Sequence, residues 1–162
     1  MSAPLLVTPV EVWEIAFPPN ANGPDDQINE TLIETAQLRY LKPVLGPLYD
    51  TLGESRQESF VTQFLKKPLA YYVKSLALSL MSASVGSLGI LEGKTDYAAP
   101  VSIRQLHLLR KEARHQADLL LEQSIEYIEA NPTLFPEYDP HRNIRHKIRM
   151  QGGLVLKAVS KS

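Results

Sequence analysis

An apolar stripe at helical spacing runs for about 28 residues through the second half of the chain and limits what the chain can fold into. It begins after Ser102 and stops at the Asn131-Pro132 pair. One face stays small or apolar throughout, at Leu106, Leu109, Ala113, Ala117, Leu120, Ser124 and Ile128. Ser102 and Gln105 form a capping-box pattern, so one long helix is predicted from Ser102 to Asn131.

Capping residues and prolines mark shorter helices before it. Thr8, Pro9 and Glu11 supply an N-cap hydroxyl, a proline at the first helical position and a glutamate at the third. A first helix is therefore predicted to begin there and to end before the proline pair at 18–19. After a loop rich in Pro, Asn and Gly, helical spacing predicts a second helix from about residue 25 to residue 41, that is, from Asp25 to Leu41.

Proline and glycine predict a tight connection at residues 43–47, followed by a short helical turn at residues 47–49. Residues 55–58, Ser-Arg-Gln-Glu, have the pattern of another capping box. The helix that it opens would carry three apolar side chains on one side: Phe60, Phe64 and Leu65. Pro68 is expected to restart the chain.

The next helix is predicted from Leu69 to near Gly86. Its apolar stripe comprises Leu69, Tyr72, Val73, Leu76, Leu80 and Ala83. The uncharged stretch 75–91 contains five serines and is shorter than a membrane span of about 20 apolar residues, so we interpret it as a buried central helix. A long connection, with room for a short hairpin, then leads to Pro100.

Together these patterns predict an all-α fold. We expect an antiparallel helical bundle of about four to five helices, with a long loop before the longest helix and an extended C-terminal arm. The chain has no cysteine, which excludes disulfides, thiolate metal sites and a cysteine nucleophile. We divide the chain into a helical-bundle domain, residues 1–138, and a basic arm, residues 139–162.

The division follows an uneven distribution of charge. Residues 141–162 carry six Lys or Arg residues and no acid, which leaves 11 bases and 18 acids in the chain before them. The arm is predicted to order on a partner, with its basic part on an acidic surface and its apolar part added as a strand to a sheet edge. The residues predicted to make these contacts are Arg142, Arg145, Lys147, Arg149, Leu154, Val155 and Leu156. A fraying terminus and a phosphate-binding tail are the alternatives.

No pattern in the sequence predicts catalytic, cofactor-binding or metal-binding residues. His107 and His115 lie eight residues apart with Lys111 between them, which is not a metal-ligand spacing. The acids at 25–26 stand at a predicted helix start, where they favour the helix dipole. We therefore expect no enzyme, no cofactor and no metal.

One face of the long helix carries charges at steps of four: Arg110, Arg114, Asp118, Glu122 and Glu126. The bases precede the acids, an order that opposes the helix dipole. Either this face is simply solvated, or it is a subunit interface in which the basic patch of one copy meets the acidic patch of the next.

Two segments resemble a known family. Leu32 to Leu52 contains a helix followed by Pro-Val-Leu-Gly and Pro-Leu-Tyr, and residues 127–138 read Tyr-Ile-Glu-Ala-Asn-Pro-Thr-Leu-Phe-Pro-Glu-Tyr. Both are similar to head-tail connector (adaptor) proteins of tailed bacteriophages, especially those of crAss-like and related phages. The similarity covers roughly residues 5–138 and leaves the tail unaligned.

The resemblance implies a virion protein of the phage neck, made in the host cytoplasm, that forms a ring of typically about twelve copies under the portal. Its partners would be itself, the portal protein and a tail or second neck-ring protein, with DNA passing through the lumen without sequence-specific binding and with no membrane involved. A neck stopper or tail-completion protein, a nucleic-acid-binding regulator that uses the basic tail, and a helical-bundle enzyme or ligand binder remain as alternatives.

Overall fold

The computed structural model describes residues 4–18, 28–87 and 102–146. All regular structure in these ranges is helical, so the predicted all-α fold is confirmed. The hairpin suggested between residues 86 and 100 and the strand-forming segment of the tail lie outside the described residues. Five residues predicted for the arm also lie outside them: Lys147, Arg149, Leu154, Val155 and Leu156.

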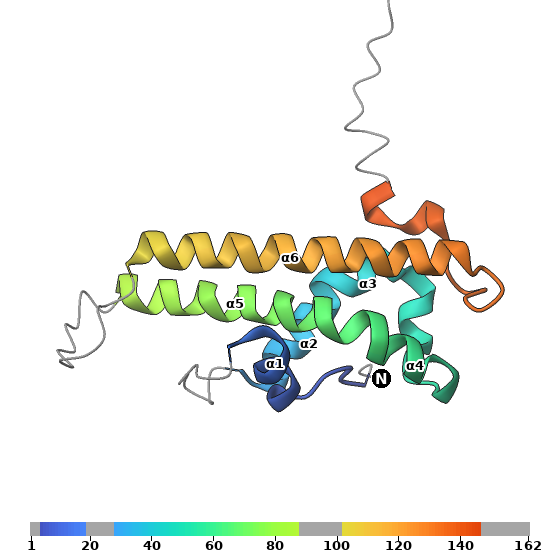
Figure 1. The fold of residues 1–162 in the computed structure, drawn as a ribbon, viewed down its shortest axis with the longest axis horizontal. Helices are drawn as coiled ribbons and strands as arrows, with labels where there is room; N and C mark the ends of the chain where they lie inside the picture. Colours follow the sequence, from blue (N-terminus) through green and yellow to red (C-terminus); the bar gives the residue numbers. More distant parts are fainter. Residues whose placement is uncertain (1–3, 19–27, 88–101, 147–162) are drawn as a thin grey trace, which may run out of the picture.

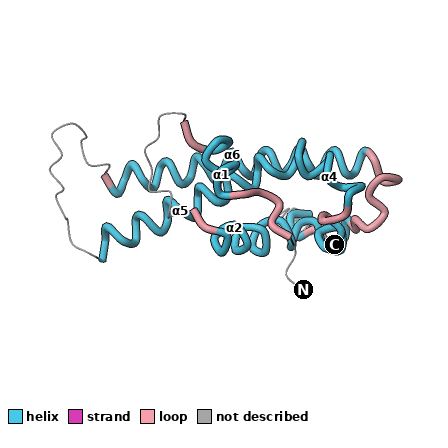
Figure 2. The backbone as a smooth tube through the Cα atoms, turned by 90° about the horizontal axis from the view of Figure 1, so that it is seen from below, coloured by secondary structure: helices cyan, strands magenta, loops and turns pink. Residues whose placement is uncertain are grey.

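A long antiparallel pair of helices forms the backbone of the molecule. Helix α5 (Lys66–Ser87) and helix α6 (Ile103–Ala130) lie side by side along most of their length (Figure 1). The smaller helices gather around one part of this pair. Both views show the last turns of α5 and the first turns of α6 projecting beyond the smaller helices (Figures 1 and 2). The molecule is therefore a packed body with a two-helix projection.

Helix α1 (Pro9–Ala16) is fastened to α5 by two lysines. Lys66 forms an ion pair with Glu11, which lowers the pKa of that carboxyl. Lys74 donates from Nζ to the carbonyl oxygen of Ala16 at 2.6 Å, and burial lowers the pKa of this amine. These contacts hold the N-terminal segment against the long pair.

Two wide helical turns carry the chain past prolines that were predicted to break it. Helix α2 (Glu30–Ala36) continues through a π-helical turn, η2 (Gln37–Leu41), into α3 (Lys42–Leu45). Helix α4 (Glu58–Phe60) continues likewise through η5 (Val61–Leu65) into α5. Each wide turn closes with a bond between residues five apart, Lys42 to Gln37 and Lys66 to Val61.

The expected breaks at Pro43 and Pro68 are thus wrong. A proline in a helix lacks one donor and crowds the carbonyl four residues before it, and a wider turn relieves both effects. The first real break comes at Gly46, whose φ of 57° is readily reached only by glycine. The short turn predicted next is observed as the 3-10 helix η3 (Gly46–Thr51).

The core lies where α1, α2 and α3 meet the inner faces of α5 and α6. Its fully buried side chains include Ile33, Leu45, Leu65, Leu69, Tyr72 and Leu121. The predicted stripes are only partly correct, because Leu80 and Leu109 are 56% and 48% exposed and Leu121 replaces Leu120 as the buried residue. Leu80 lies in the second half of α5 and Leu109 in the first half of α6, the parts of the two helices that are nearer to the projection.

The structure confirms two of the predicted helix starts and corrects two others. Thr8 and Ser102 both form complete capping boxes. The second helix starts after Asn29 rather than at Asp25, because the Asn29 side chain accepts from Leu32 N–H. No capping box forms at Ser55, since the extended residue there is Glu54 and a 3-10 turn, η4 (Ser55–Gln57), intervenes.

Replacing Ser102 with alanine should therefore lower the free energy of unfolding by about 1 kcal/mol, because it leaves the N–H of Gln105 without its cap. Ser55→Ala is the matched control and should change stability by less than about 0.5 kcal/mol, since no cap is lost. Urea unfolding of both variants measures the difference. Equal losses would contradict this assignment of the caps.

Candidate functional site

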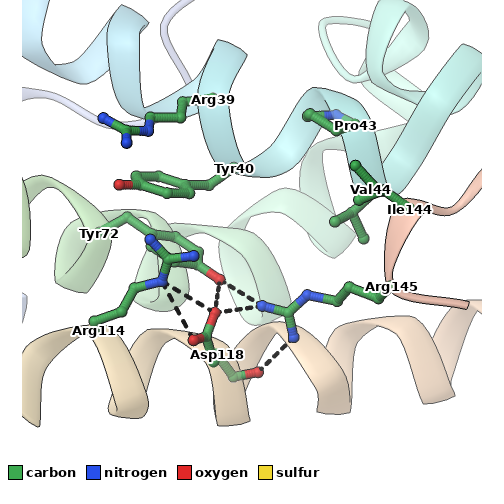
Figure 3. Close-up of a pocket in the computed structure, with 9 residues that line it drawn as sticks. All are labelled: Arg39, Tyr40, Pro43, Val44, Tyr72, Arg114, Asp118, Ile144 and Arg145. Carbon is green, nitrogen blue, oxygen red and sulfur yellow. Dashed lines mark hydrogen bonds and ion pairs between the residues drawn. The ribbon is translucent and has the colours of Figure 1, made fainter. Parts of the chain in front are cut away.

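A groove lies between η2, α5, α6 and the segment that follows α6. It consists of two adjoining hollows of about 560 and 570 Å³. The hollows share Arg39, Tyr40, Arg114 and Asp118, and the first of them is drawn in Figure 3. The groove is thus assembled from segments that are distant from one another in the chain.

Asp118 is the centre of a hydrogen-bond network in this groove. Its carboxylate accepts from the Tyr72 hydroxyl at 2.6 Å, from Arg114 Nε at 3.2 Å and from the guanidinium of Arg145 (Figure 3). Arg145 also donates to the Tyr72 hydroxyl oxygen at 2.8 Å and to the Asp118 carbonyl at 3.2 Å. One carboxylate therefore receives two guanidinium groups, which leaves a net positive charge.

Aromatic rings fix the position of Arg114. Tyr40 stacks on Tyr72 with ring centroids 4.3 Å apart and planes 14° from parallel. The Arg114 guanidinium lies 4.2 Å from the Tyr40 centroid and 5.2 Å from that of Tyr72. A cation over aromatic faces and bonded to a carboxylate has little freedom. Arg114 and Asp118 are therefore parts of the groove wall.

Burial raises the pKa of the Tyr72 hydroxyl well above its usual value, and the hydrogen bond to Asp118 adds to the effect. Near the end of α6, burial likewise raises the pKa of Tyr138 to about 12. Both hydroxyls therefore stay protonated in the folded chain at a pH where they ionise in the unfolded chain.

This difference predicts a loss of stability at alkaline pH. An ordinary tyrosine ionises near pH 10, so the stabilisation is complete below pH 10 and falls as the pH rises above it. Above pH 10, and as long as the folded chain keeps Tyr72 protonated, the free energy of unfolding should fall by up to about 1.4 kcal/mol per pH unit. Urea unfolding at pH 9 and pH 11.5 measures the fall, which should be smaller in Tyr72→Phe; an equal fall in both chains would contradict the prediction.

The first part of the predicted arm packs against the body. After Tyr138 the chain forms a short 3-10 helix, η6 (Pro140–Arg142), and the Asn143 side chain is fully buried. Asn143 donates to the Tyr138 hydroxyl at 2.8 Å, and His146 Nε2 lies 3.0 Å from Glu129 Oε1. The change of charge near residue 140 therefore does not coincide with a boundary of packing.

The predicted site residues separate into two groups. Arg114, Asp118 and Arg145 meet in one network, while Arg142 is exposed, with Nε 3.8 Å from an oxygen of Asp139. Of the remaining residues of the charged stripe, Arg110 lines the second hollow and is half-buried, Glu122 is half-buried and Glu126 is exposed.

Sequence reasoning missed four groove residues: Arg39, Tyr40, Tyr72 and Lys111. It placed Tyr72 in an apolar stripe and used Lys111 only to argue against a metal site. The hydroxyl of Tyr72 was the available signal, since a buried hydroxyl needs a hydrogen-bond partner.

No three His, Asp or Glu side chains gather to hold a metal ion in the part of the chain that the structure describes. Over the same residues, no helix is both long and apolar enough to cross a membrane.

One protein-family model matches residues 25–148, and the family is described as a family of unknown function, DUF6712. The match includes every helix of the groove and extends past Arg145. No curated protein and no solved structure matches the chain significantly.

Proposed function

We propose that this chain, which belongs to the DUF6712 family, is a structural subunit of the head-tail connector of a tailed bacteriophage. In this role several copies form a ring beneath the portal, join the capsid to the tail and let DNA pass. The resemblance of residues 32–52 and 127–138 to connector proteins supports the proposal. Its partners are further copies of itself, the portal protein and a tail or second neck-ring protein.

The observation that carries the proposal is the apolar surface of the projection. Near its free end α6 exposes Ile103, Leu108 and Leu109, at 47%, 59% and 48%. Leu108 and Leu109 are consecutive, so they point about 100° apart around the helix and expose apolar surface on two flanks. A subunit of a closed ring has a neighbour on each side, and apolar surface on both flanks suits that arrangement.

The charge distribution is compatible with the passage of DNA. The chain before residue 141 contains 18 acids and 11 bases. A ring of such subunits repels the phosphate backbone and limits sticking as DNA moves through it.

Mass photometry of the purified chain, alone and mixed with the portal ring, tests the proposal. We expect a ring-sized species or a defined number of copies on the portal. Leu108→Ser combined with Leu109→Ser should abolish it, while Leu134→Ser, which changes a leucine 56% exposed at the other end of the molecule, should not. A chain that ignores the portal, stays monomeric and shifts in size only on DNA would overturn the proposal in favour of a nucleic-acid-binding regulator.

A chain that ends at His146 separates the role of the tail from that of the body. This end point preserves Arg145 and its contacts with Asp118 and Tyr72. If residues 147–162 bind the portal, the shortened chain keeps its self-assembly and loses the portal-bound species. A shortened chain that binds the portal as well as the full chain would exclude the arm as the portal contact.

A further inference from the structure

The groove holds more positive charge than its own residues neutralise. Five permanent cations line it: Arg39, Arg110, Lys111, Arg114 and Arg145. The acid among the lining residues is Asp118, which already binds Arg114 and Arg145. Within the described residues, Arg39, Arg110 and Lys111 have no ion pair. The groove therefore has an excess of positive charge that favours binding of an anionic partner.

The two halves of α6 carry opposite charge. Residues 103–116 contain four Lys or Arg and one acid, and residues 117–130 contain four acids and no Lys or Arg. Of these four acids, Asp118 belongs to the groove wall and Glu129 contacts Tyr138 and His146, and Glu122 and Glu126 lie between them. The order of bases before acids opposes the helix dipole at both ends and so gains nothing from it. The acidic half ends the helix on the side of the molecule away from the projection (Figure 1).

A single copy cannot join these two surfaces. Arg110 and Glu122 are 12 positions apart on one continuous helix, which separates their Cα atoms by about 18 Å. Lys111 and Glu126 are about 22 Å apart by the same measure. The side chains are too short to bridge such gaps along a rigid helix. Arg110 and Lys111 therefore do not reach Glu122 or Glu126 of their own chain, and they can contact these acids only on another copy.

We infer that the groove receives the acidic half of α6 of a second copy of the chain, with Arg39, Arg110 and Lys111 contacting Glu122 and Glu126. The inference rests on the proposed assembly and names the surfaces that meet in it. It differs from a contact made by the whole charged stripe, because Arg114 and Asp118 belong to the groove wall and Arg39 comes from another helix.

DNA phosphates would also be attracted by free cations. A second copy is favoured because its acidic surface is present at the same concentration as the groove, and because the excess of acids over bases in the chain before residue 141 opposes approach of a polyanion. One apolar flank of the projection lies on the same helix as Arg110 and Lys111 and can be covered by the same neighbour.

Two charge-reversed variants test the pairing. The groove variant carries Arg110→Glu and Lys111→Glu, and the acidic-surface variant carries Glu122→Lys and Glu126→Lys. Each alone should lose self-assembly by at least tenfold in concentration, because like charges then face each other. An equimolar mixture should recover it, since each altered surface meets an altered partner of opposite sign. Mass photometry or native mass spectrometry measures both states.

Two further variants keep the test specific. Arg39→Glu should weaken self-assembly even when α6 is unchanged, because Arg39 lines the groove from η2. Lys42→Glu with Lys67→Glu changes the net charge as much as the groove variant does, at exposed positions outside both the groove and the projection, and should assemble normally. Circular dichroism and thermal melts confirm that every variant is folded.

The outcomes separate this inference from the proposed function. Folded variants that assemble as the wild-type chain does, or a mixture that fails to recover assembly, would overturn the pairing and leave the connector proposal standing. A rescued species of two copies that ignores the portal would support the pairing and count against a ring. A wild-type chain that is monomeric at every concentration, with and without the portal, would overturn both, and binding of the groove cations to DNA would then be the remaining explanation.

Discussion

Replacing Gln37 with leucine is expected to lower the free energy of unfolding by about 2 to 4 kcal/mol. The Gln37 side chain is completely buried. Its Oε1 accepts from Leu6 N–H at 2.8 Å, and its Nε2 donates to the Pro4 carbonyl at 3.2 Å and to the Tyr49 hydroxyl oxygen at 3.0 Å. Leucine has a similar volume but leaves these three groups without partners, and an unsatisfied buried group costs about 1 to 3 kcal/mol.

Chemical denaturation monitored by circular dichroism measures this loss. Gln63→Leu is the matched control, because Gln63 is exposed and its Nε2 donates to the nearby Ser59 hydroxyl. The control should change stability by less than about 0.5 kcal/mol. Tyr49→Phe removes one of the three contacts, so its loss in free energy of unfolding should lie between those of Gln37→Leu and Gln63→Leu. A Gln37 variant as stable as its control would show that water satisfies the freed groups.

The sequence predicts the helices well where local chemistry decides them. Thr8 and Ser102 begin their helices as expected because a capping box needs only four consecutive residues. The same pattern at Ser55 forms no capping box, since Glu54 is the extended residue and the 3-10 turn η4 separates it from α4. A capping-box pattern therefore predicts a helix start only where the backbone before it also takes the capping conformation.

The prolines show a second limit of sequence reasoning. Pro43 and Pro68 are helix breakers by local rules, but the packing of the segments around them favours continuous helices. The wide turns η2 and η5 let the helices continue past these prolines, and Gln37 is the first residue of η2. Periodicity alone contains no signal for such a turn.

The candidate site was only partly predictable for the same reason. Arg110, Arg114 and Asp118 are visible as one charged face of a helix. Their partners Tyr72 and Arg145 lie 46 and 27 residues from Asp118, and nothing local links them. The family resemblance could not supply the link, because it rests on turn and packing residues and does not cover the tail.

The charge pattern of the tail led to a prediction that the structure refines. A run of bases without acids is typical of a solvated arm. The first bases nevertheless differ in role, since Arg145 binds Asp118 and Tyr72 while Arg142 is exposed. Whether each arginine is bound or exposed depends on which acid lies within its reach, and this depends on the tertiary structure.

Replacing Arg145 with alanine should release the segment 139–146 from α6. The change removes the guanidinium contacts with the Asp118 carboxylate, the Asp118 carbonyl and the Tyr72 hydroxyl. Charge-assisted bonds of this kind hold the segment more strongly than neutral ones. Amide hydrogen exchange at Asn143 and His146, whose N–H groups bond to Pro140 and Asn143, should become at least about tenfold faster.

Arg142→Ala tests whether the effect comes from the contacts or from the loss of a positive charge. Arg142→Ala removes the same positive charge, but Arg142 is exposed and lies 3.8 Å from Asp139, so exchange in the segment should remain at the wild-type rate. Exchange in the middle of α6 should be unchanged in both variants, because its buried face packs on α5. If Arg145→Ala also leaves exchange unchanged, the buried Asn143 side chain holds the segment by itself. If exchange rises only in Arg145→Ala, Arg145 fastens the base of the arm, and any part of the arm that reaches for a partner must begin after His146.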